Sequence, residues 1–262
     1  MQRTGEATTR APLRPSERLV LLVVALALVV VPVAPARPDV TGRPVFDPAK
    51  VRWSKGRPDT VVAVRTTRRA VALSFDDGPH ERHTPEVLDI LRRFGAKATF
   101  FDEGAAVAER PDLVRRTVAE GHEVGNHTFT HPDLPPLAYA DVLTEVERTS
   151  AALREADVEA VPLFRPPRGL FDQEAADAVR ATSHLTVGWD VCLERYLARS
   201  PDDAAAVAAA LDRVRPGSIV LAHDGGDIDR SRTVATLPAF LAGLRDRGFE
   251  VVTITDLLGD AR

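Results

Sequence analysis

Two adjacent carboxylates, a pair of histidines and a further histidine are the side chains of this sequence best suited to chemistry. Asp76 and Asp77 lie in the hexapeptide S-F-D-D-G-P, His127 and His131 form an H-x-x-x-H pair, and His223 follows near the end. A carboxylate and two imidazoles can hold a divalent cation and leave one position open for water, as in catalytic zinc sites. The neighbouring carboxylate can then accept a proton from that water, and the last histidine can donate one to a leaving group. The combination predicts a metal-dependent hydrolase, although each piece alone is a common pattern.

Several polar or aromatic side chains stand at or just after the end of a strand-like run, namely Asp76, Asp77, His127, Arg165, Trp189 and His223. Apolar or extended runs predict strands at 70–73, 98–101, 123–126, 161–164, 185–189, 218–221 and 249–252. Helical periodicity predicts helices at 84–94, 139–156, 173–181, 201–214 and 233–247, with a short one through Leu113 and Val114. We expect Thr84 to be the N-cap of the first helix, and Pro238 to kink the last or mark its true start. Strands that alternate with helices indicate a parallel α/β sheet or barrel, whose strand ends converge on one face.

Composition and charge narrow the function classes. The 262 residues are enough for one sizeable core, and the formal net charge of −4 shows no basic excess of the kind that accompanies nucleic-acid binding. Cys192 is the only cysteine, so an intrachain disulfide is excluded. The sequence does not indicate an oligomeric state.

The amino-terminal residues predict export. Four arginines between residues 3 and 18 precede an apolar run at 19–31, which continues to a small-x-small ending at 34–36. This pattern is typical of a secretory signal peptide, whereas the long leader favours an uncleaved signal anchor, so residues 1–36 are interpreted as one of the two. Either segment places the rest of the chain outside the cell, with membrane contact only through that segment. Residues 37–66, with four prolines and no helical period, are expected to form a linker or a loosely packed lead-in.

Four segments, in sequence order, resemble the polysaccharide deacetylase family, which is also called carbohydrate esterase family four or the NodB-homology domain. They are S-F-D-D-G-P at 74–79, G-N-H-T-F-T-H at 125–131, F-R-P-P at 164–167 and P-G-S-I-V-L-A-H-D at 216–224. The resemblance covers residues 67–257 and implies one catalytic domain, a distorted (β/α) barrel of about seven strands. It also implies removal of N-acetyl groups from a polysaccharide that contains N-acetylglucosamine, such as peptidoglycan or a chitin-like glycan.

The resemblance carries residue roles over by position. It implies a catalytic group made of the base Asp76, its partner Arg165 and the acid His223, and a metal site made of Asp77, His127 and His131. Substrate contacts are expected from Pro167, Arg168, Trp189 and Leu221. The two imidazoles and the carboxylate would hold one divalent ion, for which zinc is the first choice and cobalt, nickel or manganese are alternatives.

This chain departs from the family pattern in two motifs: Arg168 stands where the third motif usually continues with tyrosine, and a further motif is altered at Cys192, Arg195 and Tyr196. The family motif D-x-x-D-W, aligned through Trp189, places Cys192 at the first aspartate, which normally supports the acid histidine. Asp190 lies two residues earlier on an extended segment, and we expect it to supply the missing charge to His223. The altered motif leaves two alternatives open: an O-acetyl esterase on acetylated polysaccharide, and a non-catalytic carbohydrate-binding relative.

The remaining histidines and the late acidic residues carry no motif. The histidines interpreted as surface or loop residues are His80, His83, His122 and His184. The aspartates interpreted as a solvated acidic turn, because they lack the spacing of an EF-hand loop, are Asp224, Asp227 and Asp229.

Overall fold

The computed structural model describes residues 46–261; the predicted leader at 1–36 and the start of the predicted lead-in lie outside the described residues. Within the described part, no helix is both long and apolar enough to span a membrane. The strands are β1 (Val51–Trp53), β2 (Thr60–Val64), β3 (Ala70–Gly78), β4 (Thr99–Asp102), β5 (Glu123–Asn126), β6 (Leu163–Phe164), β7 (Leu185–Val187), β8 (Val191–Cys192), β9 (Ile219–His223) and β10 (Glu250–Val252). The helices are α1 (His83–Phe94), α2 (Gly104–Glu109), α3 (Pro111–Ala119), α4 (Tyr139–Glu155), α5 (Gln173–Ala181), α6 (Leu193–Leu197), α7 (Asp203–Leu211), α8 (Ser231–Asp246) and α9 (Ile254–Gly259), with 3₁₀ turns η1 (Pro48–Lys50) and η2 (Pro167–Gly169).

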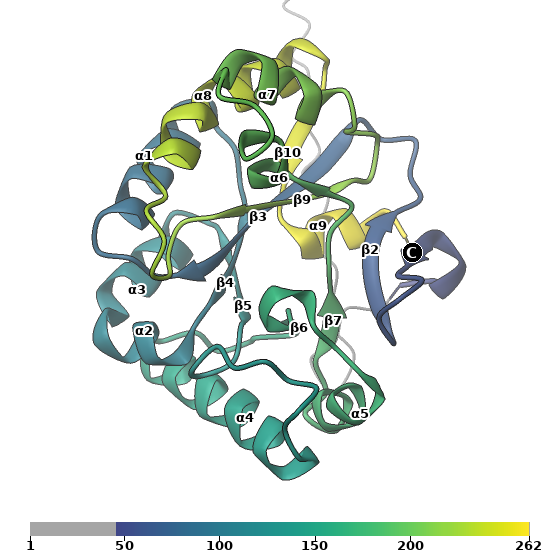
Figure 1. The fold of residues 1–262 in the computed structure, drawn as a ribbon, viewed down its shortest axis with the longest axis vertical. Coiled ribbons are helices and arrows are strands. Elements are labelled where there is room, and N and C mark those ends of the chain that lie inside the picture. Colours follow the sequence, from purple (N-terminus) through teal and green to yellow (C-terminus); the bar gives the residue numbers. More distant parts are fainter. Residues whose placement is uncertain (1–45, 262) are drawn as a thin grey trace, which may run out of the picture. The chain divides into compact units, whose positions relative to one another are not determined.

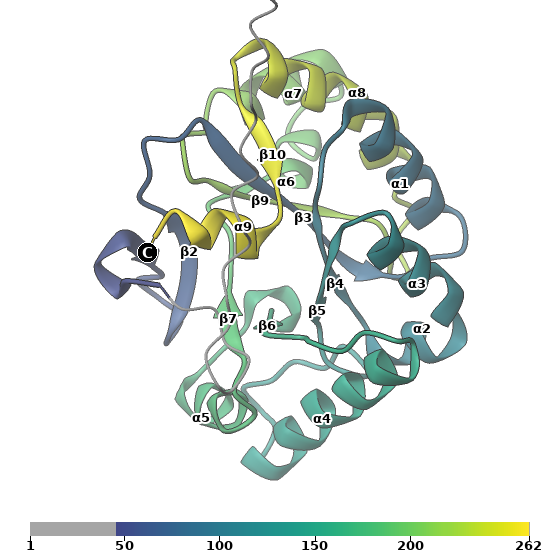
Figure 2. The ribbon, with the colours of Figure 1, turned by 180° about the vertical axis from the view of Figure 1, so that it is seen from behind.

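The strands of the described residues form one ten-stranded sheet in the order β1-β2-β7-β6-β5-β4-β3-β9-β8, with β10 beside β3. Every neighbouring pair is parallel except β1 and β2. The sheet curls, as Figures 1 and 2 show. Its curvature brings the end of β2 against the start of β9, where the N–H of Val64 donates to the carbonyl oxygen of Gly217 at 2.8 Å and Ala63 forms a β-bridge with Ser218. The expected distorted barrel is confirmed, and β2 to β7 with β9 form its continuous wall.

Strand β3 shows which side chains point to each face of the sheet. Successive strand residues point to opposite faces. Val71, Leu73 and Phe75 pack in an outer core with side chains of α1 and α8, whereas Ala70 and Ala72 pack in an inner core. The outer core therefore holds the helices onto the sheet, and the inner core fills the barrel.

One helix belongs to the inner core. Ile254, Leu257 and Leu258 of α9 pack there with Val61 and Ile219, which lie near the starts of β2 and β9. In Figure 2, α9 lies among the strands, whereas α1, α2, α3, α4 and α8 lie around the outside. The amino-terminal half of the barrel is thus filled largely by apolar side chains of α9 and of the strand starts.

The expected loose lead-in is wrong for residues 51–64. Strands β1 and β2 occupy this segment, and every residue of β2 is buried. Because both faces of β2 are covered, its short sequence lacks the alternation of apolar and polar residues that marks a half-buried strand.

Two local predictions for helices are also wrong. Helix α1 begins one residue before Thr84, and the Nδ1 atom of His80 accepts the backbone N–H groups of Arg82 and His83 in place of a threonine cap. Pro238 does not mark the start of α8, which begins at Ser231 and continues through the proline.

Candidate active site

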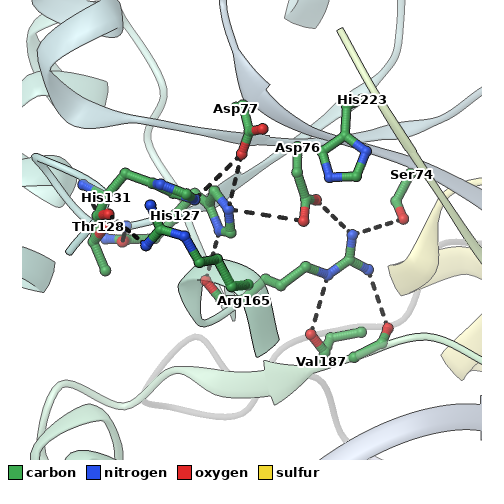
Figure 3. Close-up of polar contacts among 12 residues, drawn as sticks. Ser74, Asp76, Asp77, His127, Thr128, His131, Arg165, Val187 and His223 are labelled. Carbon is green, nitrogen blue, oxygen red and sulfur yellow. Dashed lines mark hydrogen bonds and ion pairs between the residues drawn. The ribbon is translucent and has the colours of Figure 1, made fainter. Parts of the chain in front are cut away.

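A β-bulge near the end of β3 brings two adjacent carboxylates to the same cavity. Regular alternation would direct Asp76 and Asp77 to opposite faces of the sheet. Asp76 continues the inner face, but Asp77 has a φ of 71°, and the pairing with β4 shifts register between Asp76 and Gly78. The bulge therefore lets both side chains line the space at the carboxyl ends of the strands (Figure 3).

Arg165 follows β6 and is fully buried beside Asp76. Its Nη1 lies 2.6 Å from Asp76 Oδ1 and 2.8 Å from Ser74 Oγ. Its Nε and Nη2 donate to the carbonyl oxygens of Val187 and Gly188 at 3.2 and 3.1 Å. Since each of its nitrogens is bonded, the guanidinium is immobile, and it fixes one oxygen of Asp76 while the other is left for the cavity.

Asp77, His127 and His131 meet at one point of the cavity, as the sequence predicts. Their ligand atoms lie within 4.8 Å of one another, and the Nε2 atoms of both histidines are 3.4 Å from Asp77 Oδ1. Thr128 and His131 have φ values of 70° and 55°, which fold the histidine segment into a tight turn. Among residues 46–261, this is the one group of three such side chains close enough to share a metal ion.

The surrounding contacts prepare these atoms to bind a cation. His127 Nδ1 lies 2.7 Å from the carbonyl oxygen of Arg165, so Nδ1 keeps its hydrogen, and a cation would take the place of the proton on Nε2, which the carboxylates of Asp76 and Asp77 favour by raising the pKa of this histidine against the effect of burial. Arg230 donates to Asp77 Oδ2 at 2.8 Å and leaves Oδ1 facing the histidines. Burial and the charge of His127 lower the pKa of His131 to about 4, so its imidazole is neutral near neutral pH. The donor set fits a divalent transition-metal ion.

His223, at the end of β9, is paired with Glu194 of α6. Its Nδ1 lies 3.3 Å from Glu194 Oε1, and the same oxygen accepts the backbone N–H of His223 at 2.9 Å and the hydroxyl of Thr233 at 3.1 Å. Burial lowers the pKa of His223, but the nearby carboxylate of Glu194, with Asp76 and Asp77 farther away, outweighs burial and raises that pKa. The raised pKa favours the protonated form that a general acid needs.

The prediction that Asp190 supports His223 is wrong. The carboxylate of Asp190 is bound by Arg52, the hydroxyl of Ser218 and the backbone N–H of Ile219. Cys192 supplies no charge, because burial raises the pKa of its thiol to about 11, and its Sγ lies 3.8 Å from Glu194 Oε2. The extended segment ends at Cys192, so α6 turns the chain and presents Glu194 instead.

The side chains predicted to act as base, acid and metal ligands line a cavity of about 630 Å³. The lining includes all five predicted chemical side chains, namely Asp76, Asp77, His127, His131 and His223. Of the predicted substrate contacts, Arg168, Trp189 and Leu221 line it as well, whereas Pro167 is buried in η2 and is not part of the lining.

Two buried carboxyl groups lie behind the cavity on either side of Gly78. A Cβ placed on Gly78 would come within 2.8 Å of Asp224 Oδ1 and 3.1 Å of Asp102 Oδ1. Thr84 donates its hydroxyl to Asp224. Burial raises the pKa of Asp224 to about 7 and raises the pKa of Asp102 well above its usual range. The interpretation of Asp224 as part of a solvated turn is therefore wrong.

Of the histidines interpreted as surface or loop residues, His122 and His184 do lie in loops but are buried, whereas His83 is buried at the start of α1, where the interpretation is wrong. His83, His122 and His184 are each less than a tenth exposed. His122 Nδ1 accepts the backbone N–H of Ala98 at 3.1 Å, which ties α3 to the start of β4. These side chains are part of the protein interior, so the absence of a motif around a histidine does not predict that the histidine is exposed.

Three residues that support the site carry no motif signal: Glu194, Arg230 and Glu145. Glu145 Oε2 of α4 accepts the backbone N–H groups of Phe129 and Thr130, both at 2.8 Å, and so holds the turn between the metal-site histidines. These three side chains come from a different helix or loop than the groups they hold. Only the fold brings them to the site.

The chain matches known proteins over most of its described length. The family model described as polysaccharide deacetylase matches residues 63–187. A chitooligosaccharide deacetylase from a Bradyrhizobium species is 42% identical over 200 residues, 72% of this chain and 90% of that protein. A peptidoglycan-N-acetylglucosamine deacetylase from Bacillus cereus is 36% identical over 200 residues, 74% of this chain and 91% of that protein. Among solved structures, a family-four carbohydrate esterase pseudoenzyme from Bacillus anthracis matches with a TM-score of 0.69 at 27% identity, over 76% of this chain and 68% of that one.

The chain therefore belongs to the polysaccharide deacetylase family. It is an enzyme, a hydrolase that deacetylates carbohydrate. The likeness to a pseudoenzyme shows that this fold alone does not decide activity, which depends on the side chains in the cavity.

Proposed function

We propose that the enzyme removes N-acetyl groups from a polysaccharide that contains N-acetylglucosamine, of the peptidoglycan or chitin type. One observation carries the proposal: a carboxylate fixed by a buried arginine, a three-ligand metal site and a charge-paired histidine surround a single cavity. Cleavage of an acetamide requires attack on the carbonyl carbon and protonation of the nitrogen that leaves, and the cavity offers a group for each step. The names of the Bradyrhizobium and Bacillus cereus relatives support the same substrate class.

Asp77, His127 and His131 would hold one divalent ion, with zinc as the first choice and cobalt, nickel or manganese as alternatives. When bound, such an ion polarises a carbonyl group and lowers the pKa of water. Arg168, Trp189 and Leu221, which line the cavity, are proposed to contact the sugar and its acetyl group.

The proposed proton transfers are divided between side chains of the chain. Asp76, held by Arg165, accepts the proton of the attacking water. The backbone N–H of Arg168, in a left-handed conformation with φ 54°, donates to the acetyl oxygen as that oxygen gains charge. His223, kept protonated by Glu194, gives its proton to the departing nitrogen, which is otherwise a poor leaving group.

Acetate release tests this proposal. The purified protein, stripped with a chelator and then reloaded with each of the four metals, is incubated with peptidoglycan, chitin oligomers and acetylated xylan. We expect acetate from peptidoglycan or chitin oligomers only from the metal-loaded protein, with Asp76→Asn as the inactive control. Acetate from xylan alone would instead identify an O-acetyl esterase. Glycan binding without acetate from any substrate would identify a non-catalytic relative.

Export is part of the proposal and is supported by the basic leader, apolar run and small-x-small ending of residues 1–36. Cell fractionation and sequencing of the mature amino terminus test it. A new amino terminus near residue 37 on protein outside the cell would identify a signal peptide, and full-length protein in the membrane fraction would identify an anchor. Full-length protein in the cytosol would contradict export.

A further inference from the structure

A second cavity adjoins the catalytic cavity and is lined by cationic side chains. Its volume is about 280 Å³, and it shares Arg168, Trp189 and Cys192 with the catalytic cavity. Arg57 and Arg195 add two further guanidinium groups to its wall. The two cavities are therefore adjacent in the structure.

Arg57 is built into this wall without an anionic partner. Its Cζ lies 4.7 Å from the ring centroid of Trp189. A Cβ placed on Gly169 would come within 2.8 Å of Arg57 Nη1, and one placed on Gly188 within 3.2 Å, so two glycines make room for the guanidinium. No carboxylate of the described residues forms an ion pair with Arg57, and burial together with the charge of Arg165 lowers its pKa. Arginine nevertheless stays charged in proteins, so this cavity holds a fixed and unneutralised cation.

The other charged groups of the wall do not neutralise it. Among residues 46–261, the one carboxylate that lines the cavity is Asp190, which is already bound by Arg52 and by two further donors. Arg195 is exposed and forms no ion pair with the described residues, whereas Arg168 pairs with Asp133 at 2.7 Å on the surface. The cavity therefore carries a net positive charge beside the reaction centre.

We propose that this cationic cavity (Arg57, Arg168 and Arg195) binds a carboxylate on the sugar next to the one that loses its acetyl group. The inference rests on the proposed function, because the reacting sugar must lie in the catalytic cavity. Guanidinium groups pair with carboxylates through charge-assisted, often bidentate hydrogen bonds, whereas a neutral sugar offers only hydroxyl and amide groups. The enzyme then prefers a glycan whose neighbouring sugar bears a carboxylate, on a lactyl ether or on an attached peptide, over a neutral chain of N-acetylglucosamine.

The test compares three glycans of equal sugar length: neutral chitotetraose, a peptide-free peptidoglycan tetrasaccharide with free lactyl carboxylates, and the same tetrasaccharide with its peptides. We expect kcat/KM for acetate release to be about 10- to 100-fold higher for a carboxylate-bearing glycan than for chitotetraose, the effect of a charge-assisted hydrogen bond. The better of the two peptidoglycan substrates identifies the carboxylate. Arg57→Gln should lower the preference about tenfold, and Arg195→Gln, at an exposed position, gives a second test if Arg57→Gln fails to fold.

Arg199→Gln is the matched control, because it removes the same charge from an exposed position just beyond α6 and does not line the cavity. It should keep the wild-type preference. The proposal is overturned if wild type favours chitotetraose, or if the preference is unchanged in Arg57→Gln and in the double variant with Arg195→Gln. If wild type releases acetate from none of the glycans, the proposed function fails. The glycans are then stable ligands, and their dissociation constants can be measured by calorimetry. Tighter binding of a carboxylate-bearing glycan, lost in Arg57→Gln, would still support the cationic cavity, and equal binding of all three would overturn it.

Discussion

At the scale of single residues, Asp76 and Asp77 are neighbours with different partners. Asp76 is bound by the buried Arg165, whereas Asp77 faces two histidines and has its second oxygen held by Arg230. We expect Asp77→Asn to weaken metal binding, because a charged ligand is lost. We expect Asp76→Asn to keep the metal but to lower kcat about 10²- to 10⁴-fold, the usual contribution of general acid–base catalysis. Metal content and kcat measured on both variants check this, and the opposite pattern would exchange the two roles.

Replacement of Glu194 gives a second prediction at the scale of single residues. A general acid is active when protonated, so the rate falls as the pH rises through its pKa. Since Glu194 helps to raise the pKa of His223, Glu194→Gln should lower that pKa and move the alkaline limb of the pH–rate profile to lower pH by about one unit. Asp190→Asn, which changes a carboxyl group bound elsewhere, is the control and should leave the limb in place. An alkaline limb that stays in place in Glu194→Gln would show that this pair does not tune the acid.

The residues of the site that could be predicted from sequence are those in strand-end motifs. The proposed base, metal ligands and acid occur in short segments whose residue types and order are informative, and in the folded chain they line one cavity. Glu194 and Arg230 could not be predicted in this way. Arg230 stands 153 residues from the Asp77 it holds, and Glu194 reaches His223 through the short helix α6, which no pattern in the sequence predicts.

At the scale of elements, the loop after β9 lies directly against the end of β3. A Cβ on Gly225 would come within 1.9 Å of the carbonyl oxygen of Asp77, and this is a backbone atom that no side-chain rotation can move away. We expect Gly225→Ala to displace Asp77 and to weaken metal affinity about 10-fold or more. Gly56→Ala is the matched control, because nothing lies within 4 Å of a Cβ there. Metal titration of both variants checks the prediction, and unchanged affinity in Gly225→Ala would show that the loop can shift without moving the ligand.

The longer elements could be predicted because their periodicity is sustained, as in α1, α4 and β3. The elements that were missed are short or have no exposed face. Strand β2 has five residues, all buried, and β8 with α6 together spans Val191 to Leu197. In such segments tertiary packing decides the conformation, and the local pattern carries little information.

At the scale of the whole molecule, the apolar cores are separate from the metal site. The inner core is filled by α9 in the amino-terminal half of the barrel, whereas the metal ligands lie at the carboxyl ends of the strands. We therefore expect chelation to abolish acetate release without removing the cooperative thermal transition. Calorimetry with and without chelator checks this. A lost transition would show the ion to be structural, and full activity in metal-free protein would contradict the metal assignment.

The buried carboxyl groups behind Gly78 predict how the metal-free fold responds to pH. Asp224 has a pKa of about 7 in the folded protein, and an aspartate in the unfolded chain has a pKa of about 3.9. Between these values the folded state binds more protons at Asp224, so the contribution of Asp224 to stability falls as the pH rises, by at most about 1.4 kcal/mol per pH unit. His131, whose pKa is lowered to about 4, contributes the opposite trend, so wild type is compared with Asp224→Asn. We expect the Tm of metal-free wild type to fall relative to that of Asp224→Asn between pH 5 and 7. A Tm difference that rises over this interval would contradict the burial of Asp224 in ionisable form.

The left-handed backbone at Asp77 sets a condition on any attempt to transplant this chemistry. Two aspartates written onto the end of a regular strand in another barrel would place one carboxylate in the cavity and the other among the outer helices. The graft must also carry the inserted residue of the bulge and a glycine loop that can receive it, as Gly225 does here. A designer should therefore copy a backbone path together with its two side chains, and a screen of natural chains for the letters D-D-G alone will also collect proteins that cannot hold an ion.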